Sequence, residues 1–355
     1  MKKSKIGRGL KIMTKKFSVY TQIPGPEVER NEKSYLDFVK ETIVLTEKHG
    51  YTGSLIYYNH YMADPWIVAS YMLEHSNNII PLVATQPNAL PPHSVAKIIQ
   101  SFHAIYNRKV NINLITGNNT REIDEINDIR EHSFRYERME EYASCLKQIL
   151  ALESNSKVNF NGKYYKYTNL YMEPQVNVEF LPEIFLAGAS KEALNVSESF
   201  ADVSLTRPGP IKEFTNKYKN SYGINKLGIR VGIIARERNE DAWEVAKSRF
   251  PKSRIGKIKA IAKSTNETII NNKEIATLAV NKEIYDDVYW MGAYLSNNNN
   301  PYLVGSFEEV SNYLNLYLKT GVNCILICDL YKEEDFEYTS EVIRRLEIKS
   351  NLLSV

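Results

Sequence analysis

Three short polar runs in this 355-residue chain carry residue types that bind a phosphate-bearing cofactor. They are residues 113–117 (Asn-Leu-Ile-Thr-Gly), 132–137 (His-Ser-Phe-Arg-Tyr-Glu) and 187–190 (Ala-Gly-Ala-Ser). In the first run the asparagine and threonine offer hydrogen bonds, and the glycine lets the backbone approach a ligand closely. Taken alone, this run also suits an ordinary turn, so both interpretations stay open for it.

The other two runs are expected to open helices. His132 and Tyr136 are four residues apart, so a helix places them on one face, where an imidazole and a phenol can bind phosphate. A histidine satisfied at an interface is the alternative. Ser190 is a natural N-cap, and the free N–H groups of the helix that it begins can bind phosphate. Both roles of Ser190 can hold at once.

Alternating strands and helices must position these runs. Apolar segments that favour strands begin near residues 17, 53, 79, 110, 183, 203, 228 and 322, and most are followed by a helical pattern. Eight such units predict an α/β fold, a closed (β/α)8 TIM barrel with insertions. An open doubly wound sheet is the alternative, but no Gly-x-Gly-x-x-Gly turn supports it. Sites of such barrels form at the carboxyl ends of strands, where the polar runs lie.

Two segments fall outside the eight units. Residues 1–16 are strongly basic, which predicts a disordered leader ahead of a single barrel domain spanning residues 17–355. Residues 253–300 are polar and rich in asparagine and lysine, with consecutive asparagines at 297–300. A segment of this length predicts a mobile, lid-like insertion that closes over the site, and a plain solvated excursion explains it equally well.

Composition excludes several classes of protein. The chain has 45 Lys and Arg against 42 Asp and Glu, a net charge of +3 that is too balanced for nucleic-acid binding. No apolar run follows the basic leader, and none approaches the ~18–20 residues of a membrane helix. The small, odd number of cysteines favours a cytoplasmic protein, with Cys324 and Cys328 as buried small hydrophobes. No spacing of His, Cys and carboxylates indicates a metal site.

A longer series of motifs resembles the bacterial-luciferase-like flavin monooxygenases, and among them the branch of alkanesulfonate and pyrimidine monooxygenases. The resemblance extends from about residue 17 to residue 346 and includes the three runs above. Further matching runs are Gly-Tyr-Thr-Gly-Ser-Leu-Ile at 50–56, Asp-Pro-Trp at 64–66, Phe-Asn-Gly-Lys at 160–163, Gly-Ile-Arg at 228–230 and Arg-Glu-Arg-Asn-Glu-Asp-Ala-Trp at 236–243. It implies a TIM barrel that binds reduced FMN.

The resemblance also implies how the cofactor is held and used. The residues beside the isoalloxazine ring would be Tyr58, Asn59, His60, Asn113 and Thr116. Those holding the ribityl phosphate would be His132, Tyr136, Ala189 and Ser190. Reduced flavin would react with O2, through a C4a-peroxyflavin, to oxidise the substrate. Because no nicotinamide motif is visible, FMNH2 would come from a separate NAD(P)H:flavin reductase, and relatives usually form homodimers or homotetramers.

The chain departs from the alkanesulfonate enzymes where those handle substrate. Met62 stands in place of their active-site cysteine, Arg207 in place of a tryptophan and Gly232 in place of a histidine, whereas Arg230 matches their arginine. These changes argue against simple desulfonation. The substrate residues would be Met62, Arg207 and Arg230, and the two arginines would suit an anionic substrate. A structural ion pair is the alternative for each arginine.

The candidates for catalysis are Asn113, His60 and Arg230. Asn113 would hold the dioxygen, and His60 is the candidate acid or base. The tyrosines around His60 can equally form an aromatic wall.

The expected function is therefore an FMNH2-dependent monooxygenase that acts on a small organic molecule, and the two arginines leave room for an anionic one. An F420-dependent oxidoreductase of the same barrel family is an alternative, although the His132–Tyr136 pair and Ser190 favour FMN. A barrel that binds flavin without turnover is the other alternative, which the altered positions 62, 207 and 232 keep open.

Overall fold

The computed structural model describes residues 17–25, 34–117, 120–128, 131–188, 191–218, 226–266 and 270–352. The basic leader predicted at residues 1–16 lies outside these ranges. Within them, no helix has both the length and the apolar character needed to cross a bilayer.

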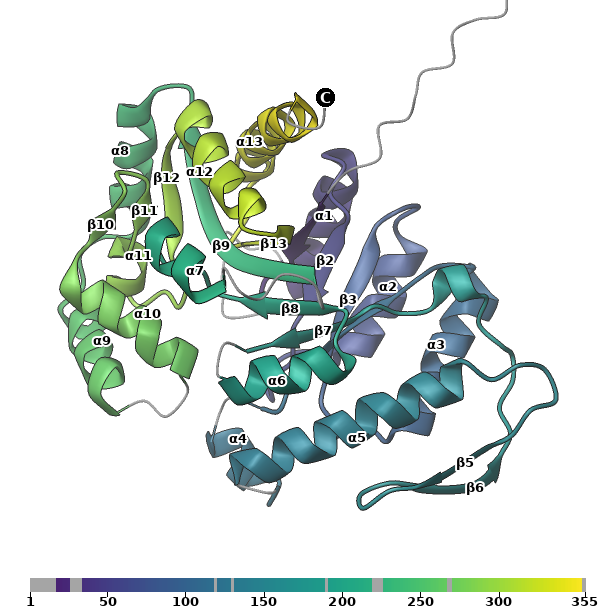
Figure 1. The fold of residues 1–355 in the computed structure, drawn as a ribbon. Helices are drawn as coiled ribbons and strands as arrows, with labels where there is room; N and C mark the ends of the chain where they lie inside the picture. Colours follow the sequence, from purple (N-terminus) through teal and green to yellow (C-terminus); the bar gives the residue numbers. More distant parts are fainter. Residues whose placement is uncertain are drawn as a thin grey trace, which may run out of the picture.

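Among the described residues, eight parallel strands close into the predicted barrel, with helices packed around it (Figure 1). They are β1 (Ser18–Gln22), β2 (Gly53–Ile56), β3 (Ile80–Thr85), β4 (Asn111–Leu114), β7 (Ile184–Ala187), β8 (Val203–Thr206), β9 (Lys226–Arg236) and β13 (Val322–Cys328). The ring closes because β9 pairs with both β8 and β13, and β13 pairs in turn with β1. All eight strands lie where the sequence predicts them.

The helices begin and end where local chemistry favours it. At the start of α1 (Tyr35–Lys48), Ser34 and Asp37 form a capping box, and Asp64 caps α2 (Pro65–Glu74). Gly50 follows α1 with φ +70°, a left-handed conformation that suits glycine. The other helices around the barrel are α3 (Pro92–Tyr106), α4 (Thr120–Glu125), α5 (His132–Leu150), α6 (Lys191–Phe200), α7 (Ile211–Tyr218), α8 (Asn239–Arg249), α12 (Phe307–Lys319) and α13 (Glu333–Leu352).

The barrel separates an inner from an outer apolar core. The inner cluster consists of Tyr20, Leu55, Leu82, Phe185, Val203, Leu205, Cys324 and Leu326. Because side chains alternate along a strand, the intervening residues face outward and pack under the helices in two larger clusters. Cys324 and Cys328 are buried, as predicted, and burial raises the pKa of each thiol to about 12.

A two-stranded hairpin follows α5 and consists of β5 (Val158–Asn161) and β6 (Lys166–Leu170). In its turn the Gly162 N–H donates to the Tyr165 carbonyl at 2.9 Å. The Glu141 carboxylate of α5 holds this turn, because it accepts the backbone N–H groups of residues 163–165 at 2.7–2.8 Å.

Residues 253–300 contribute more to the core than their polar composition indicates. They contain α9 (Arg254–Asn266), α10 (Ile270–Asn281), β10 (Ile284–Tyr285), β11 (Tyr289–Trp290) and α11 (Gly292–Leu295). β11 pairs with β12 (Tyr302–Ser306), a strand that was not predicted from the sequence. β12 pairs in turn with the carboxyl-terminal half of β9. Tyr289, Trp290 and Met291 are almost completely buried there. The insertion is therefore anchored in the fold, and its closure as a lid stays a prediction.

Candidate active site

Polar side chains replace the apolar filling at the carboxyl end of the barrel. Inward-facing positions recur at every second residue of a strand. Asn113 is the register partner of the interior residue Phe185, and Arg230 is that of Leu326. The same alternation places further residues at the carboxyl end. We call the resulting set the mouth ring, and it consists of four polar residues and one buried thiol: Gln22, Asn113, Arg207, Arg230 and Cys328.

Asn113 presents a buried acceptor that no described residue uses. The residue is 5% exposed, and its Oδ1 has no hydrogen-bond partner among the described residues. Asn111, one layer deeper on the same strand, is fully engaged. It donates to the Tyr20 hydroxyl at 3.0 Å and accepts the Glu183 N–H at 2.9 Å. An unmade hydrogen bond at a buried atom is costly, so the Asn113 oxygen is suited to a ligand at the mouth.

Arg230 reaches from β9 toward β1 at the mouth. Its Nη2 donates to Gln22 Oε1 at 2.7 Å, which joins β9 to β1. Its Nε is buried and lacks a hydrogen-bond partner among the described residues. Arg230 therefore has donor capacity left for a ligand, and its role as a substrate-binding arginine stays a prediction.

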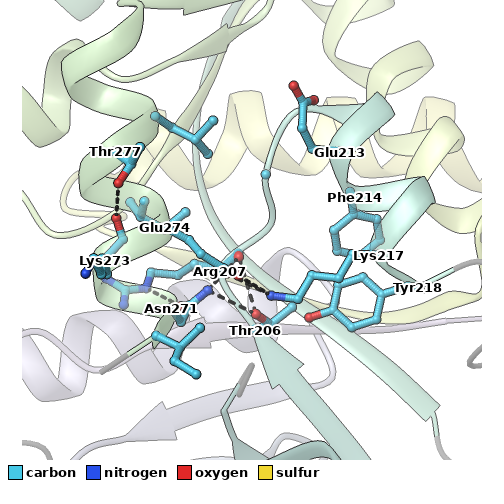
Figure 2. Close-up of a pocket in the computed structure, with 14 residues that line it drawn as sticks. Thr206, Arg207, Glu213, Phe214, Lys217, Tyr218, Asn271, Lys273, Glu274 and Thr277 are labelled. Carbon is cyan, nitrogen blue, oxygen red and sulfur yellow. Dashed lines mark hydrogen bonds and ion pairs between the residues drawn. The ribbon is translucent and has the colours of Figure 1, made fainter. Parts of the chain in front are cut away.

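Arg207 extends from the end of β8 toward α10 (Figure 2). Its Nε donates to Asn271 Oδ1 at 3.0 Å, its Nη1 to the Asn299 carbonyl at 2.8 Å, and its Nη2 to Asn272 Oδ1. These acceptors are neutral, so its hydrogen bonds do not make the structural ion pair considered from the sequence. Burial, followed by the charge of Arg230, lowers the pKa of Arg207 to about 10, which leaves it charged at neutral pH.

Gly232 stands where the alkanesulfonate enzymes have a histidine, and a side chain from a neighbouring strand fills the space beside it. Gly232 and Tyr302 are register partners, and a Cβ on Gly232 would lie 2.4 Å from the Tyr302 ring. The Tyr302 hydroxyl donates to Asp329 Oδ2 at 2.8 Å. A buried phenol and a carboxylate thus stand where the sequence indicates only the loss of a side chain. The sequence could not show this, because the pairing of β12 with β9 was not predicted.

The loop after β2 carries four predicted site residues. His60 Nδ1 lies 2.7 Å from Glu125 Oε2 of α4, and the Tyr58 ring contacts the His60 ring edge-on, with centroids 5.9 Å apart. His60, followed by Arg121, lowers the pKa of Glu125. Asn59 Oδ1 accepts the N–H of residue 61 at 2.9 Å and so shapes the turn that leads to Met62. A carboxylate partner for His60 suits an acid–base role, while Asn59 is used structurally.

The expected phosphate end is only partly described. His132 is the first residue of α5, as predicted, and Tyr136 is buried in the outer core one turn later. Thr116 is partly exposed in the loop after β4, next to Gly117, which has φ +81°. Ala189 and Ser190 lie outside the described residues, directly before the start of α6. The phosphate assignments therefore stay predictions.

A cavity of about 400 Å³ lies between α7 and α10 (Figure 2). Its walls include Phe214 and Ile275 of the outer core, and the ion pair between Lys217 and Glu274, at 2.7 Å, is part of its lining. It therefore lies outside the barrel and shares only Arg207 with the mouth ring. Among the described residues, no cluster of His, Cys, Asp and Glu is suited to a metal ion.

A family model described as luciferase-like monooxygenase matches residues 16–324. The chain belongs to this family. A relative from Niallia circulans, 4-(gamma-L-glutamylamino)butanoyl-[BtrI acyl-carrier protein] monooxygenase BtrO, is 38% identical over 327 residues, which cover 91% of this chain and 95% of the relative. The protein is thus an enzyme, a luciferase-like monooxygenase, as its motifs predicted.

Solved structures confirm the fold of this luciferase-like monooxygenase. EDTA monooxygenase EmoA from Chelativorans sp. BNC1 has a TM-score of 0.72 at 12% identity, covering 95% of both chains. Riboflavin lyase RcaE, solved with modified FMN and riboflavin, has a TM-score of 0.75 at 12% identity, covering 95% of this chain and 92% of its own. An F420-dependent secondary alcohol dehydrogenase has a TM-score of 0.63 at 13% identity, covering 93% and 99%. This fold therefore accommodates either FMN or F420.

The structure of this luciferase-like monooxygenase brings some of the predicted site residues together at the barrel mouth and places others on a separate loop. Asn113, Arg207 and Arg230 belong to one ring at the barrel mouth, whereas His60 is paired with Glu125 on the loop after β2. Sequence reasoning missed residues that hold the two arginines. They are Gln22, Asn271 and Asn272, and the signal that could have found Gln22 is its place two residues after the inward-facing Tyr20.

Proposed function

We propose that this protein is an FMNH2-dependent monooxygenase that receives reduced flavin from a separate NAD(P)H:flavin reductase. When bound, reduced FMN supplies the two electrons that activate O2, so that one oxygen atom enters the substrate and the other leaves as water. The observation that carries the proposal is the buried, unpartnered Asn113 Oδ1 at the mouth of a luciferase-like barrel. An isoalloxazine ring has N–H groups that can donate to such an acceptor.

The chain's own residues would divide the remaining tasks. Asn113 would orient the ring, and Thr116, Tyr58 and Asn59 would border it. His132, Tyr136, Ala189 and Ser190 would hold the phosphate, where the N-terminus of α6 offers free N–H groups. His60, fixed by Glu125, would hold or move a proton, and Met62 would lie beside the substrate.

The substrate side of the site favours a negatively charged molecule. Arg207 and Arg230 bring two positive charges to one side of the mouth, and their hydrogen bonds to Asn271, Asn272, the Asn299 carbonyl and Gln22 supply no negative charge. The relative from Niallia circulans acts on an acyl group carried by an acyl-carrier protein, and that acyl group ends in a glutamyl unit. We propose a substrate of the same class: an acyl chain with a free carboxylate, delivered as a carrier-protein thioester.

The reaction is tested with purified protein, FMN, NADH and an unrelated flavin reductase under 18O2. The 4-(gamma-L-glutamylamino)butanoyl group is supplied on a carrier protein and, in a parallel sample, as the free acid. We expect one labelled oxygen atom in each molecule of product, and no product when the reductase is omitted. Oxygen consumption that ends only in hydrogen peroxide with both substrates would refute the monooxygenase function for this substrate class.

A further inference from the structure

The asparagines at 297–300 resemble a solvated tract in sequence, but they contact other parts of the fold. Lys259 Nζ of α9 donates to Asn297 Oδ1 at 2.9 Å, and Lys263 Nζ donates to Asn299 Oδ1 at 3.3 Å. Asn297 has φ +76°, a left-handed conformation that asparagine tolerates better than most residues. The run is therefore shaped and held against α9.

The other two asparagines bind Asp329, the residue that follows β13. Asp329 Oδ2 accepts the Nδ2–H groups of Asn298 and Asn300 at 3.1 and 3.4 Å, together with the Tyr302 hydroxyl at 2.8 Å. Its Oδ1 accepts the Tyr331 hydroxyl at 2.9 Å. Four neutral donors thus satisfy this carboxylate, and it fixes residues 297–300 at the carboxyl end of the barrel.

The fixed run holds Arg207 through its backbone. The Asn299 carbonyl accepts Arg207 Nη1, while the side chains of Asn271 and Asn272 accept Nε and Nη2. A guanidinium has five N–H groups, so these three bonds leave two for a ligand. Arg207 is held in one direction without losing its charge.

Arg230 likewise keeps unused N–H groups and a positive charge that its partner Gln22 does not neutralise. Its Nε is buried and lacks a partner among the described residues, although Nη2 binds Gln22. β8 and β9 pair in parallel with Thr206 opposite Ile229, so Arg207 and Arg230 are the next residues along neighbouring strands. The charge of Arg230 accordingly lowers the pKa of Arg207. Asp329, the carboxylate that directly follows Cys328 of the mouth ring, is engaged by neutral donors. An oxyanion between the arginines would remove their repulsion and use the spare N–H groups.

We propose that Arg207 and Arg230 form a two-arginine site for a free carboxylate of the substrate, and that residues 297–300 position Arg207 in it. The identity of the ligand as substrate rests on the proposed function. The phosphate of the cofactor is another source of the same oxyanion chemistry, and the test separates the two.

The site is tested by titrating glutarate into the flavin-free protein, followed by NMR at constant ionic strength. We expect glutarate to bind and the neutral analogue glutaramide not to bind. Arg207→Gln should weaken glutarate binding more than tenfold, and Arg230→Gln is a second variant with the same expectation. The control Arg254→Gln removes an exposed charge from α9 and should change the affinity less than twofold. Unchanged glutarate affinity in both mouth variants would overturn the site.

The positioning role is tested with a double-mutant cycle. Asn298→Ala should weaken glutarate binding several-fold in the wild-type background and have no further effect in the Arg207→Gln background, because it acts through Arg207. A purely structural role would lower the melting temperature and leave the two losses additive. Additive losses would therefore overturn the positioning part of the proposal.

The source of the oxyanion is tested by titrating FMN into wild-type protein and Arg207→Gln. Unchanged FMN affinity in the variant would support the substrate carboxylate as the ligand. A loss as large as that for glutarate would assign the site to the cofactor phosphate and overturn the proposal. If wild-type protein binds no FMN, the proposed function fails, whereas the glutarate titration of flavin-free protein still decides whether the anion site exists.

Discussion

Replacing Asn113 with leucine should change stability and flavin binding in opposite directions. The Asn113 Oδ1 is buried without a hydrogen-bond partner among the described residues. A polar atom in that state costs about 1–3 kcal/mol, and leucine has a similar shape without it. Flavin-free Asn113→Leu should therefore be more stable than wild type by about 1 kcal/mol, measured by chemical denaturation.

The same substitution should weaken FMN binding. A hydrogen bond contributes about 0.5–1.5 kcal/mol net, which corresponds to a loss of affinity of roughly two- to twelvefold. Fluorescence quenching of FMN measures this loss directly. If Asn113→Leu is more stable than wild type and binds flavin less well, the Asn113 oxygen serves flavin binding and not folding.

Asn111→Leu is the matched control, since Asn111 has the same residue type on the same strand and also faces inward. It would leave the Tyr20 hydroxyl and the Glu183 N–H without their partner, so it should destabilise the protein by about 1–3 kcal/mol. Its FMN affinity should be close to that of wild type. If Asn113→Leu destabilises the flavin-free protein as much as Asn111→Leu and binds FMN normally, Asn113 is a structural residue and the cofactor site is misplaced.

Three further outcomes are expected. Gly232→Ala should destabilise the protein by about 1–3 kcal/mol in denaturant titrations because its Cβ would clash with Tyr302, whereas Gly209→Ala, with no contact closer than 3.7 Å, should be tolerated. Arg344 and then Arg345 lower the pKa of Glu341 to about 2, so its contribution to stability is complete above pH 4.5 and is lost as the pH falls toward 2. The stability difference between wild type and Glu341→Gln should shrink over that range, and a constant difference would contradict this. Cys145, Cys324 and Cys328 are buried, and each thiol has a pKa of about 12. A thiol reagent at mildly alkaline pH should therefore label no cysteine in the folded protein and all three in denaturant. Rapid labelling of the folded protein would disprove their burial.

The barrel could be predicted because each of its strands is a short apolar run bounded by turn residues and followed by a helix. β12 could not be predicted, because it is a short segment that follows a polar tract and Pro301, and only its pairing with β9 makes it a strand of the fold. The asparagines at 297–300 illustrate the same limit, because their partners are on α9 and after β13.

The candidate site was predictable where function follows from position on a strand. Asn113 lies near the end of β4 and Arg230 lies within β9, and their direction into the barrel follows from the alternation of side chains along each strand. The neutral partners of Arg207 could not be foreseen, because Asn271 is 64 residues away in sequence and reaches it only through the fold of the insertion. Gln22 is 208 residues from Arg230.

The most direct measurement of the cofactor assignment is an anaerobic titration of wild-type protein with FMNH2, oxidised FMN and reduced F420. We expect FMNH2 to bind more tightly than oxidised FMN, reduced F420 to leave bound FMNH2 in place, and Asn113→Leu to weaken FMNH2 binding. Displacement of FMNH2 by reduced F420, or the absence of FMNH2 binding, would contradict an FMNH2-dependent monooxygenase.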